Sequence, residues 1–363
     1  MSVDVLDAAM SQLERADQAD EADGFPHFAD PVTGEWTTSP DGDWTGGFHV
    51  GQLWLGVASG LRPDLADSAA RWAQKLASRV STDTVFRGFL FWYGVAAGAR
   101  LSGDQGLRSL ACRGAEGLAG SYVDAAGLLP LGSAGEEAHS VGPGEANIDG
   151  VPGGTPLLAW AAEELDEPEM RSKALSHARR HAEWLVRDDG SVVQSASFDT
   201  ATGGLVRTYT HKGVSDDSTW TRAQAWALLG FAQASAVERS FDDVASAVAD
   251  WWMTHLPESG VTTWDFDDPD PNAPTDTSGT AIASAALLKL AELGIGDSSG
   301  YRQCAERSVA ALVENHLKAD GRLVDGCYNN RIGLATNAEL VWGDYFLLES
   351  CCVLGGRLSA TEL

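Results

Sequence analysis

Segments with helical periodicity follow one another along this chain. The connections between them are alternately short and long. Apolar residues recur every three or four positions over most of the 363 residues, the spacing that places them on one face of a helix. This pattern predicts helices near 2–22, 46–60, 64–80, 87–101, 104–124, 150–165, 168–187, 217–236, 240–255, 276–294, 298–318 and 339–354. Starting after the first helix, every second connection is mostly long: 23–45, 81–86, 125–149, 188–216, 256–275 and 319–338.

The alternation of loop lengths favours one architecture. Helices joined by short turns run antiparallel, so connections of the same class lie at the same end. Six such hairpins closed into a ring form an all-α (α/α)6 barrel, in which the long loops share one face and build the ligand site. We expect a single domain over residues 1–363, with one short β-hairpin between 190 and 206. An open helical solenoid is the alternative.

The charge balance excludes two classes of partner. The chain has 25 Lys+Arg against 52 Asp+Glu, a net charge of −27, which repels nucleic-acid phosphates and anionic lipid headgroups. Residues 1–24 lack the basic start and apolar run of a secretion signal, and no apolar stretch is long enough to span a membrane. We therefore expect a cytoplasmic protein, a monomer or small homo-oligomer, with no nucleic-acid or membrane partner.

Neither a metal site nor a disulfide framework is indicated. The five cysteines are odd in number and lack zinc-site spacing. His177 and His181 are four residues apart on a predicted helix, as metal ligands often are, but the neighbouring arginines favour an exposed face. The glycines that follow Asp149 do not form a phosphate loop. The sequence predicts no metal and no other cofactor.

Tryptophans gather at the ends of the long connections. The chain has 13 Trp, and flat aromatic rings stack on the apolar faces of sugars. Trp44, Trp220 and Trp226 lie close to glycines and polar residues, which favours a role in sugar binding. The deeper positions are more typical of core residues: Trp54, Trp92 and Trp342.

Carboxylates occur at the same helix starts. Asp216, Asp267 and Asp276 fit helix N-caps, because Asp favours the first helical turn. Asp149 lies instead in an apolar and glycine-rich segment, where burial would raise its pKa into the range that acid/base catalysis needs. For Asp149, capping and catalysis remain equally open at this point.

Five blocks of the chain resemble glycoside hydrolase family 88, the unsaturated glucuronyl hydrolases. The related unsaturated rhamnogalacturonyl hydrolases share much of the pattern. The blocks keep the family's order: Trp44–Phe48 with Gly51–Trp54, Asn147–Val151 with Pro156–Trp160, Val214–Phe231, Trp264–Asp267 with Asp276–Ile282, and Gly343–Glu349.

The resemblance implies an (α/α)6 barrel that acts in polysaccharide degradation. Its substrates would be lyase products with a 4,5-unsaturated uronic acid at the non-reducing end. In the family, a carboxylic acid protonates C4 of the C4=C5 bond, and water activated by the same group adds at C5. Asp149 matches this acid/base. The substrate-site positions are matched by Trp44, Trp220, Arg222 and Trp226, with Arg222 suited to a uronate carboxylate.

The chain departs from the family around this acid. Val85-Phe86-Arg87-Gly88-Phe89 stands where the family reads His-Asp-Leu-Gly-Phe, so its second Asp is Phe86. A family His corresponds to Gln194 and a family Gln to Lys212, whereas a family Trp has no counterpart near Leu129–Ser133. Gln194, Lys212 and Arg87 are accordingly predicted to bind substrate, the two cations through a carboxylate or sulfate.

Two interpretations follow from the loss of the second Asp. In the first, the chain still hydrates unsaturated uronides, with an altered substrate. In the second, it has diverged to another uronide, to saturated glycosides or to isomerisation, or it binds sugar without catalysis. Loss of a supporting carboxylate costs on the order of 10²–10⁴ in rate unless another group compensates.

Overall fold

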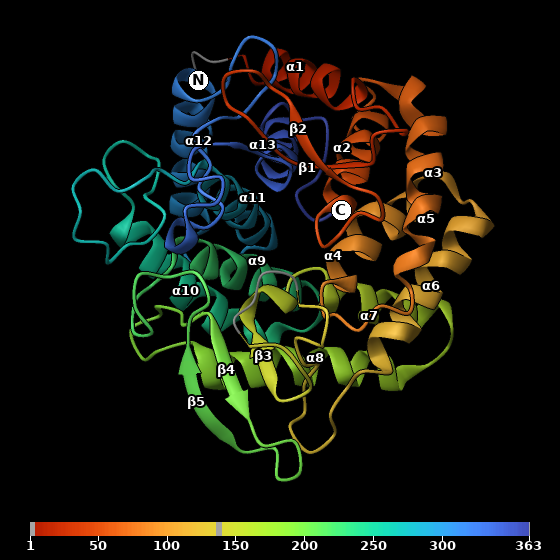
Figure 1. Ribbon diagram of the computed structural model, residues 1–363, viewed down its shortest axis with the longest axis vertical. Coiled ribbons are helices and arrows are strands. Elements are labelled where there is room, and N and C mark those ends of the chain that lie inside the picture. Colours follow the sequence, from red (N-terminus) through yellow and green to blue (C-terminus); the bar gives the residue numbers. More distant parts are fainter. Residues whose placement is uncertain (1–3, 136–139, 363) are drawn as a thin grey trace.

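Six helical hairpins close into a ring in the computed structural model, which describes residues 4–135 and 140–362 (Figure 1). Each inner segment contacts the next, and the last contacts the first, so the ring is closed rather than an open solenoid. The fold is the predicted (α/α)6 barrel. The inner segments are α2 (Gly46–Ala58), the continuous α4 (Arg87–Phe91), η3 (Trp92–Ala96) and α5 (Ala97–Ser102), α7 (Gly154–Glu164), α9 (Thr221–Val237), α11 (Thr277–Leu293) and α13 (Val341–Leu354).

The outer helices cover this ring. They are α1 (Val5–Asp17), α3 (Ala66–Lys75), α6 (Gln105–Ala119), α8 (Pro168–Leu185), α10 (Asp242–His255) and α12 (Ser298–Asn315), with short 3-10 turns at Pro63–Leu65, Leu76–Arg79 and Arg239–Phe241. The two layers differ in burial: α3 buries only Ala69, Trp72 and Ala73, whereas α9 is buried along nearly its whole length. Every predicted helix is present in the structure, and its ends differ from the prediction by a few residues.

Short strands tie the long connections together on one face. Among the described residues, one antiparallel sheet joins β2 (Trp36–Ser39), β1 (Phe25–Ala29) and β6 (Glu339–Leu340), which links the first long connection to the last. A second joins β3 (Glu145–Asn147), β4 (Ser195–Phe198) and β5 (Leu205–Tyr209). The β4–β5 pair confirms the predicted hairpin, although it extends beyond residue 206.

The core contains the deeper tryptophans, as predicted. Trp54, Trp92 and Trp342 are buried among the inner segments. Capping was predicted correctly at Asp276, which accepts a hydrogen bond from the Ser278 amide at the start of α11. It was wrong for Asp216, which accepts from the Thr210 amide, because α9 begins later than expected. It was also wrong for Asp267, which accepts from the Thr219 amide and lies nine residues before the N-cap of α11, Asp276.

The helices of residues 4–135 and 140–362 include none with both the length and the apolar character needed to cross a bilayer. The five cysteines are buried and unbridged.

Close packing between α4 and α7 depends on a glycine. A Cβ built at Gly88 would lie 2.5 Å from the Gly154 backbone nitrogen and 2.7 Å from its Cα, closer than side chains approach backbone atoms. A Cβ on the facing Gly154 would meet only a methyl group of Leu118, at 3.8 Å. The absence of a side chain at Gly88 therefore sets the helix spacing directly beside the mouth of the barrel.

We expect Gly88→Ala to destabilise the fold by about 1–3 kcal/mol, because the added methyl group forces α4 and α7 apart. Gly154→Ala is the matched control and should change stability by less than about 1 kcal/mol, since Ala favours helix and meets no close contact there. Urea unfolding followed by circular dichroism measures both. Equal losses in the two variants would contradict this account of the packing.

Candidate active site

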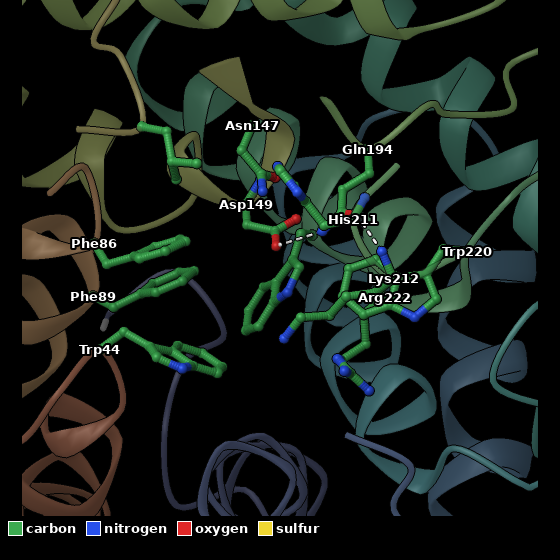
Figure 2. Close-up of a pocket in the computed structure, with 12 residues that line it drawn as sticks. Trp44, Phe86, Phe89, Asn147, Asp149, Gln194, His211, Lys212, Trp220 and Arg222 are labelled. Carbon is green, nitrogen blue, oxygen red and sulfur yellow. Dashed lines mark hydrogen bonds between the residues drawn. The ribbon is translucent and has the colours of Figure 1, made fainter. Parts of the chain in front are cut away.

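A pocket opens on the long-loop face, where the inner helices begin. Its walls come from four of the six long connections and from the first two turns of the helices α4 and α9. The lining residues are Trp44, Phe86, Phe89, Leu131, Asn147, Asp149, Gln194, His211, Lys212, Trp220, Arg222 and Trp226. Figure 2 shows Asp149 between an aromatic side and a cationic side.

The aromatic side is a continuous wall of rings. Phe86 and Phe89 are stacked with centroids 5.8 Å apart and planes 5° from parallel. Trp44 lies 5.8 Å from Phe86, and Trp226 lies 4.9 Å from Phe89. Phe86, which the sequence resemblance aligns with the family's second Asp, therefore lines the pocket of Asp149 with an apolar ring, and no second carboxylate is among the described residues that line it.

Two basic side chains form the opposite side. The Lys212 ammonium lies 4.0 Å from the ring centroid of Tyr328, and the Arg222 guanidinium lies 4.5 Å from that of Trp220. Arg222 is also fixed from behind: Nη1 donates to Asp276 Oδ2 at 2.5 Å, and Nη1 and Nη2 donate to main-chain carbonyl groups at residues 327 and 328. Both of its terminal nitrogens thus have protein partners, which makes Arg222 a rigid buried cation.

Asp149 is held at the junction of the two sides. It lies in the 3-10 turn Ile148–Gly150, directly after β3, and Asn147 Oδ1 accepts a hydrogen bond from its amide at 3.0 Å. Gln194 Nε2 donates to Asp149 Oδ2 at 3.3 Å. Asp149 Oδ1 is buried and has no hydrogen-bond partner among the described residues. One carboxylate oxygen is therefore held by the protein, and the hydrogen-bonding capacity of the other is unused within the described residues.

Burial raises the pKa of Asp149 to about 7. Lys212, the hydrogen bond from Gln194 and the Arg222 charge oppose the rise, because each stabilises the carboxylate form. A raised pKa is what the apolar sequence around Asp149 predicted. The group exists in comparable amounts as acid and base near neutral pH, as an acid/base catalyst requires.

The prediction that His177 and His181 lie on an exposed face is wrong. Both are buried on the inward face of α8. His177 Nδ1 accepts from the Leu129 amide at 3.1 Å, so its Nε2 carries the proton and donates to the Gly150 carbonyl at 3.2 Å. His177 thereby supports the turn that holds Asp149. The described residues contain no cluster of His, Cys, Asp or Glu suited to a metal ion.

The structure brings together seven of the eight residues predicted for the site: Trp44, Asp149, Gln194, Lys212, Trp220, Arg222 and Trp226. Arg87 is the exception, and the prediction that it binds substrate in the pocket is wrong. Its Nε donates to the Thr84 carbonyl at 3.0 Å and its Nη1 to the Val80 carbonyl at 3.3 Å, so the guanidinium is buried behind the start of α4. It does not line the pocket.

Sequence reasoning missed several pocket residues. Asn147 and His211 stand beside predicted residues, and their polar side chains at loop ends were an available signal. Tyr328, which contacts the lining residues Trp44 and Lys212 and is not itself among the lining residues, was harder to foresee. Its hydroxyl accepts from Trp44 Nε1 at 3.0 Å and its ring packs against Lys212, contacts between residues far apart in the chain.

Known proteins resemble this chain along nearly its whole length. The family model described as Glycosyl Hydrolase Family 88 matches residues 139–348. An unsaturated glucuronyl hydrolase of Bacillus sp. (strain GL1) is 32% identical over 345 residues, covering 90% of each chain. An unsaturated chondroitin disaccharide hydrolase of Streptococcus agalactiae serotype III (strain NEM316) is 27% identical, covering 85% of this chain and 80% of the relative.

A crystal structure of unsaturated glucuronyl hydrolase from Bacillus sp. GL1, described as responsible for the degradation of glycosaminoglycan, superposes with a TM-score of 0.90. The two are 29% identical in sequence, and the match covers 99% of this chain and 98% of that chain. The agreement extends over the whole barrel.

The raised pKa of Asp149 predicts a pH-dependent effect on stability. Between pH about 4 and 7, the unfolded chain has lost this proton while the folded chain keeps it, so rising pH destabilises the fold through this group. Asp149→Asn does not titrate. Its melting temperature should therefore rise relative to that of the parent from pH 4 to 7 and then level off. The corresponding change in the free energy of unfolding, relative to the parent, is on the order of a few kcal/mol.

Differential scanning calorimetry of the parent and of Asp149→Asn across pH 4–8.5 measures this difference in melting temperature. The titrations of all other groups are common to both proteins and cancel in the difference. A difference that stays constant over the window would show that the Asp149 pKa is not raised.

Proposed function

Because this chain belongs to glycoside hydrolase family 88, we propose that it removes a 4,5-unsaturated uronic acid from the non-reducing end of oligosaccharides left by polysaccharide lyases. The observation that most supports this is Asp149, a buried carboxyl with a pKa of about 7 between an aromatic wall and two cations. Such a site suits a flat, anionic sugar ring. The named activities of the two relatives agree with this substrate class.

Asp149 acts first as an acid and then as a base. Its carboxyl gives a proton to C4 of the C4=C5 bond, and the positive charge that develops at C5 is shared with the ring oxygen. Water loses a proton to the Asp149 carboxylate and adds at C5, which restores the carboxyl. The hemiketal so formed opens at the ring oxygen, and the glycosidic bond then breaks to release the neighbouring sugar. One carboxyl performs both steps, so the spacing of two glycosidase carboxylates does not apply.

The other pocket residues bind the ring and its charge. Trp44, Trp220 and Trp226 offer aromatic faces for stacking against the sugar. Lys212 attracts the uronate carboxylate, and Arg222 adds a fixed positive charge behind it. A bound uronate carboxylate would offset the two positive charges, which otherwise favour ionised Asp149, and so help to keep the catalytic carboxyl protonated.

Phe86 is the observation that favours a second candidate. Without the family's second carboxylate, the barrel could serve a different sugar reaction, on another uronide or a saturated glycoside, or an isomerisation, or it could bind sugar only. Apolar burial offers a substitute for that carboxylate, because it too holds Asp149 in the acid form. The hydration reaction remains the better supported of the two.

We expect the protein to consume lyase-generated unsaturated disaccharides, with loss of the ultraviolet absorbance of the conjugated double bond. Activity should fall above pH about 7 as Asp149 loses its proton, and Asp149→Asn should lose at least about 10³-fold in kcat. Saturated glucuronides serve as the comparison substrate. Turnover of those, but not of the unsaturated sugars, would favour the second candidate.

Lys212→Gln restores the family's residue and tests the charge. Loss of a charge-assisted contact should raise KM for the unsaturated uronide about 10- to 100-fold. The falling limb of the pH profile should also move to higher pH, because Lys212 lowers the pKa of Asp149. Lys318→Gln, an exposed position, is the control and should leave both unchanged. An unaltered KM in Lys212→Gln would exclude Lys212 from substrate binding.

A further inference from the structure

The side-chain amide of Gln194 has a fixed orientation. Its Oε1 accepts three hydrogen bonds, from Thr210 Oγ1 at 2.9 Å, the His211 amide at 2.9 Å and the Lys212 amide at 3.2 Å. An NH₂ group could accept none of these bonds. The oxygen end therefore faces the turn at 210–212, and the nitrogen end faces Asp149.

Gln194 is also joined to the Asp149 turn through its main chain. Its carbonyl accepts from the Ile148 amide at 2.9 Å, one residue before Asp149. Its side chain is 2% exposed, so water does not compete for the amide. The two contacts fix the distance and the orientation of Gln194 relative to the carboxyl of Asp149.

The two oxygens of Asp149 are consequently unequal. Oδ2 receives the N–H of Gln194, whereas Oδ1 has no partner within the described residues (Figure 2). An amide N–H only donates, so it favours an oxygen that bears no proton. When Asp149 is a carboxylic acid, its proton is accordingly expected on Oδ1.

We propose that Gln194 is a positioning residue, which fixes Oδ1 of Asp149 as the oxygen that gives and regains the catalytic proton. The inference rests on the proposed function and changes the role predicted for Gln194 from binding the sugar to orienting the acid. During turnover the proton passes from Oδ1 to C4 of the sugar, and a proton from water returns to Oδ1. The Gln194 N–H remains on Oδ2 throughout and is not transferred.

Gln194→Met tests this without adding charge. Loss of the donor should raise the titration midpoint of Asp149 by about one unit, since the hydrogen bond favours the carboxylate. It should lower kcat about 10- to 100-fold, because the proton is no longer confined to one oxygen, and change KM less than about threefold. Gln194→His, which can donate an N–H at the same place, should recover much of kcat.

Two further variants separate this effect from damage to the fold. Thr210→Val removes one of the three donors to Oε1 and should shift the midpoint in the same direction, but less. Gln233→Met is the matched control, since Gln233 is a buried amide that accepts from the Gly153 amide and donates to Tyr93 Oη, away from Asp149. It should leave the midpoint unchanged.

The midpoint is measured by ¹³C NMR of protein labelled at aspartate carboxyl carbons, with Asp149→Asn identifying the signal. This readout needs no turnover, so it decides the role of Gln194 toward Asp149 even if unsaturated uronides are not substrates. An unmoved midpoint in Gln194→Met would overturn the proposal. So would equal shifts in Gln233→Met, or a raised KM with kcat unchanged, which would place Gln194 on the sugar.

Discussion

Closure of the inner ring is the constraint on which the rest of this structure depends. Each inner segment follows a long connection, so all six begin at the same face of the ring, and the pocket opens on that face. The dipoles of these helices place their positive ends at that face. A protein with a net charge of −27 can thus offer an acidic sugar a favourable site, since Lys212 and Arg222 add charge at the same place.

The acid/base group depends on a balance between the two sides of that pocket. Phe86 and Phe89 exclude water and raise the pKa of Asp149, while Lys212 and Arg222 lower it. Removal of either side would move the group away from neutrality, toward a permanent acid or a permanent carboxylate. Because Arg222 is held by Asp276 from behind, its positive charge has a fixed position on this side of the pocket.

Local patterns in the sequence were sufficient to predict the helices, the ring and the apolar setting that raises the pKa of Asp149, because periodicity, loop length and apolar character can be read from neighbouring residues. The errors concern the direction in which a side chain points. His177 adjoins arginines in sequence but turns inward, since successive helical residues point about 100° apart. Arg87 stands at a helix start facing the mouth, yet nearby carbonyls bind its guanidinium. Tyr328 contacts Trp44, a residue far away in the chain, and no local sequence pattern predicts such a contact.

The departures from the family form two sets, and both change the site in the same electrostatic direction. Gln194 and Lys212 are linked, because the side chain of the first accepts a hydrogen bond from the amide of the second. Together they place a cation where the family has a neutral amide, while Phe86 removes a negative charge on the opposite side. By the sequence resemblance, the pocket thus has a cation at Lys212 and an apolar ring at Phe86 where the family pattern has an amide and a carboxylate. Such a change would not help to bind a neutral glycoside, whereas it would favour the carboxylate of a uronate, so the altered residues are consistent with the proposed action on an anionic sugar.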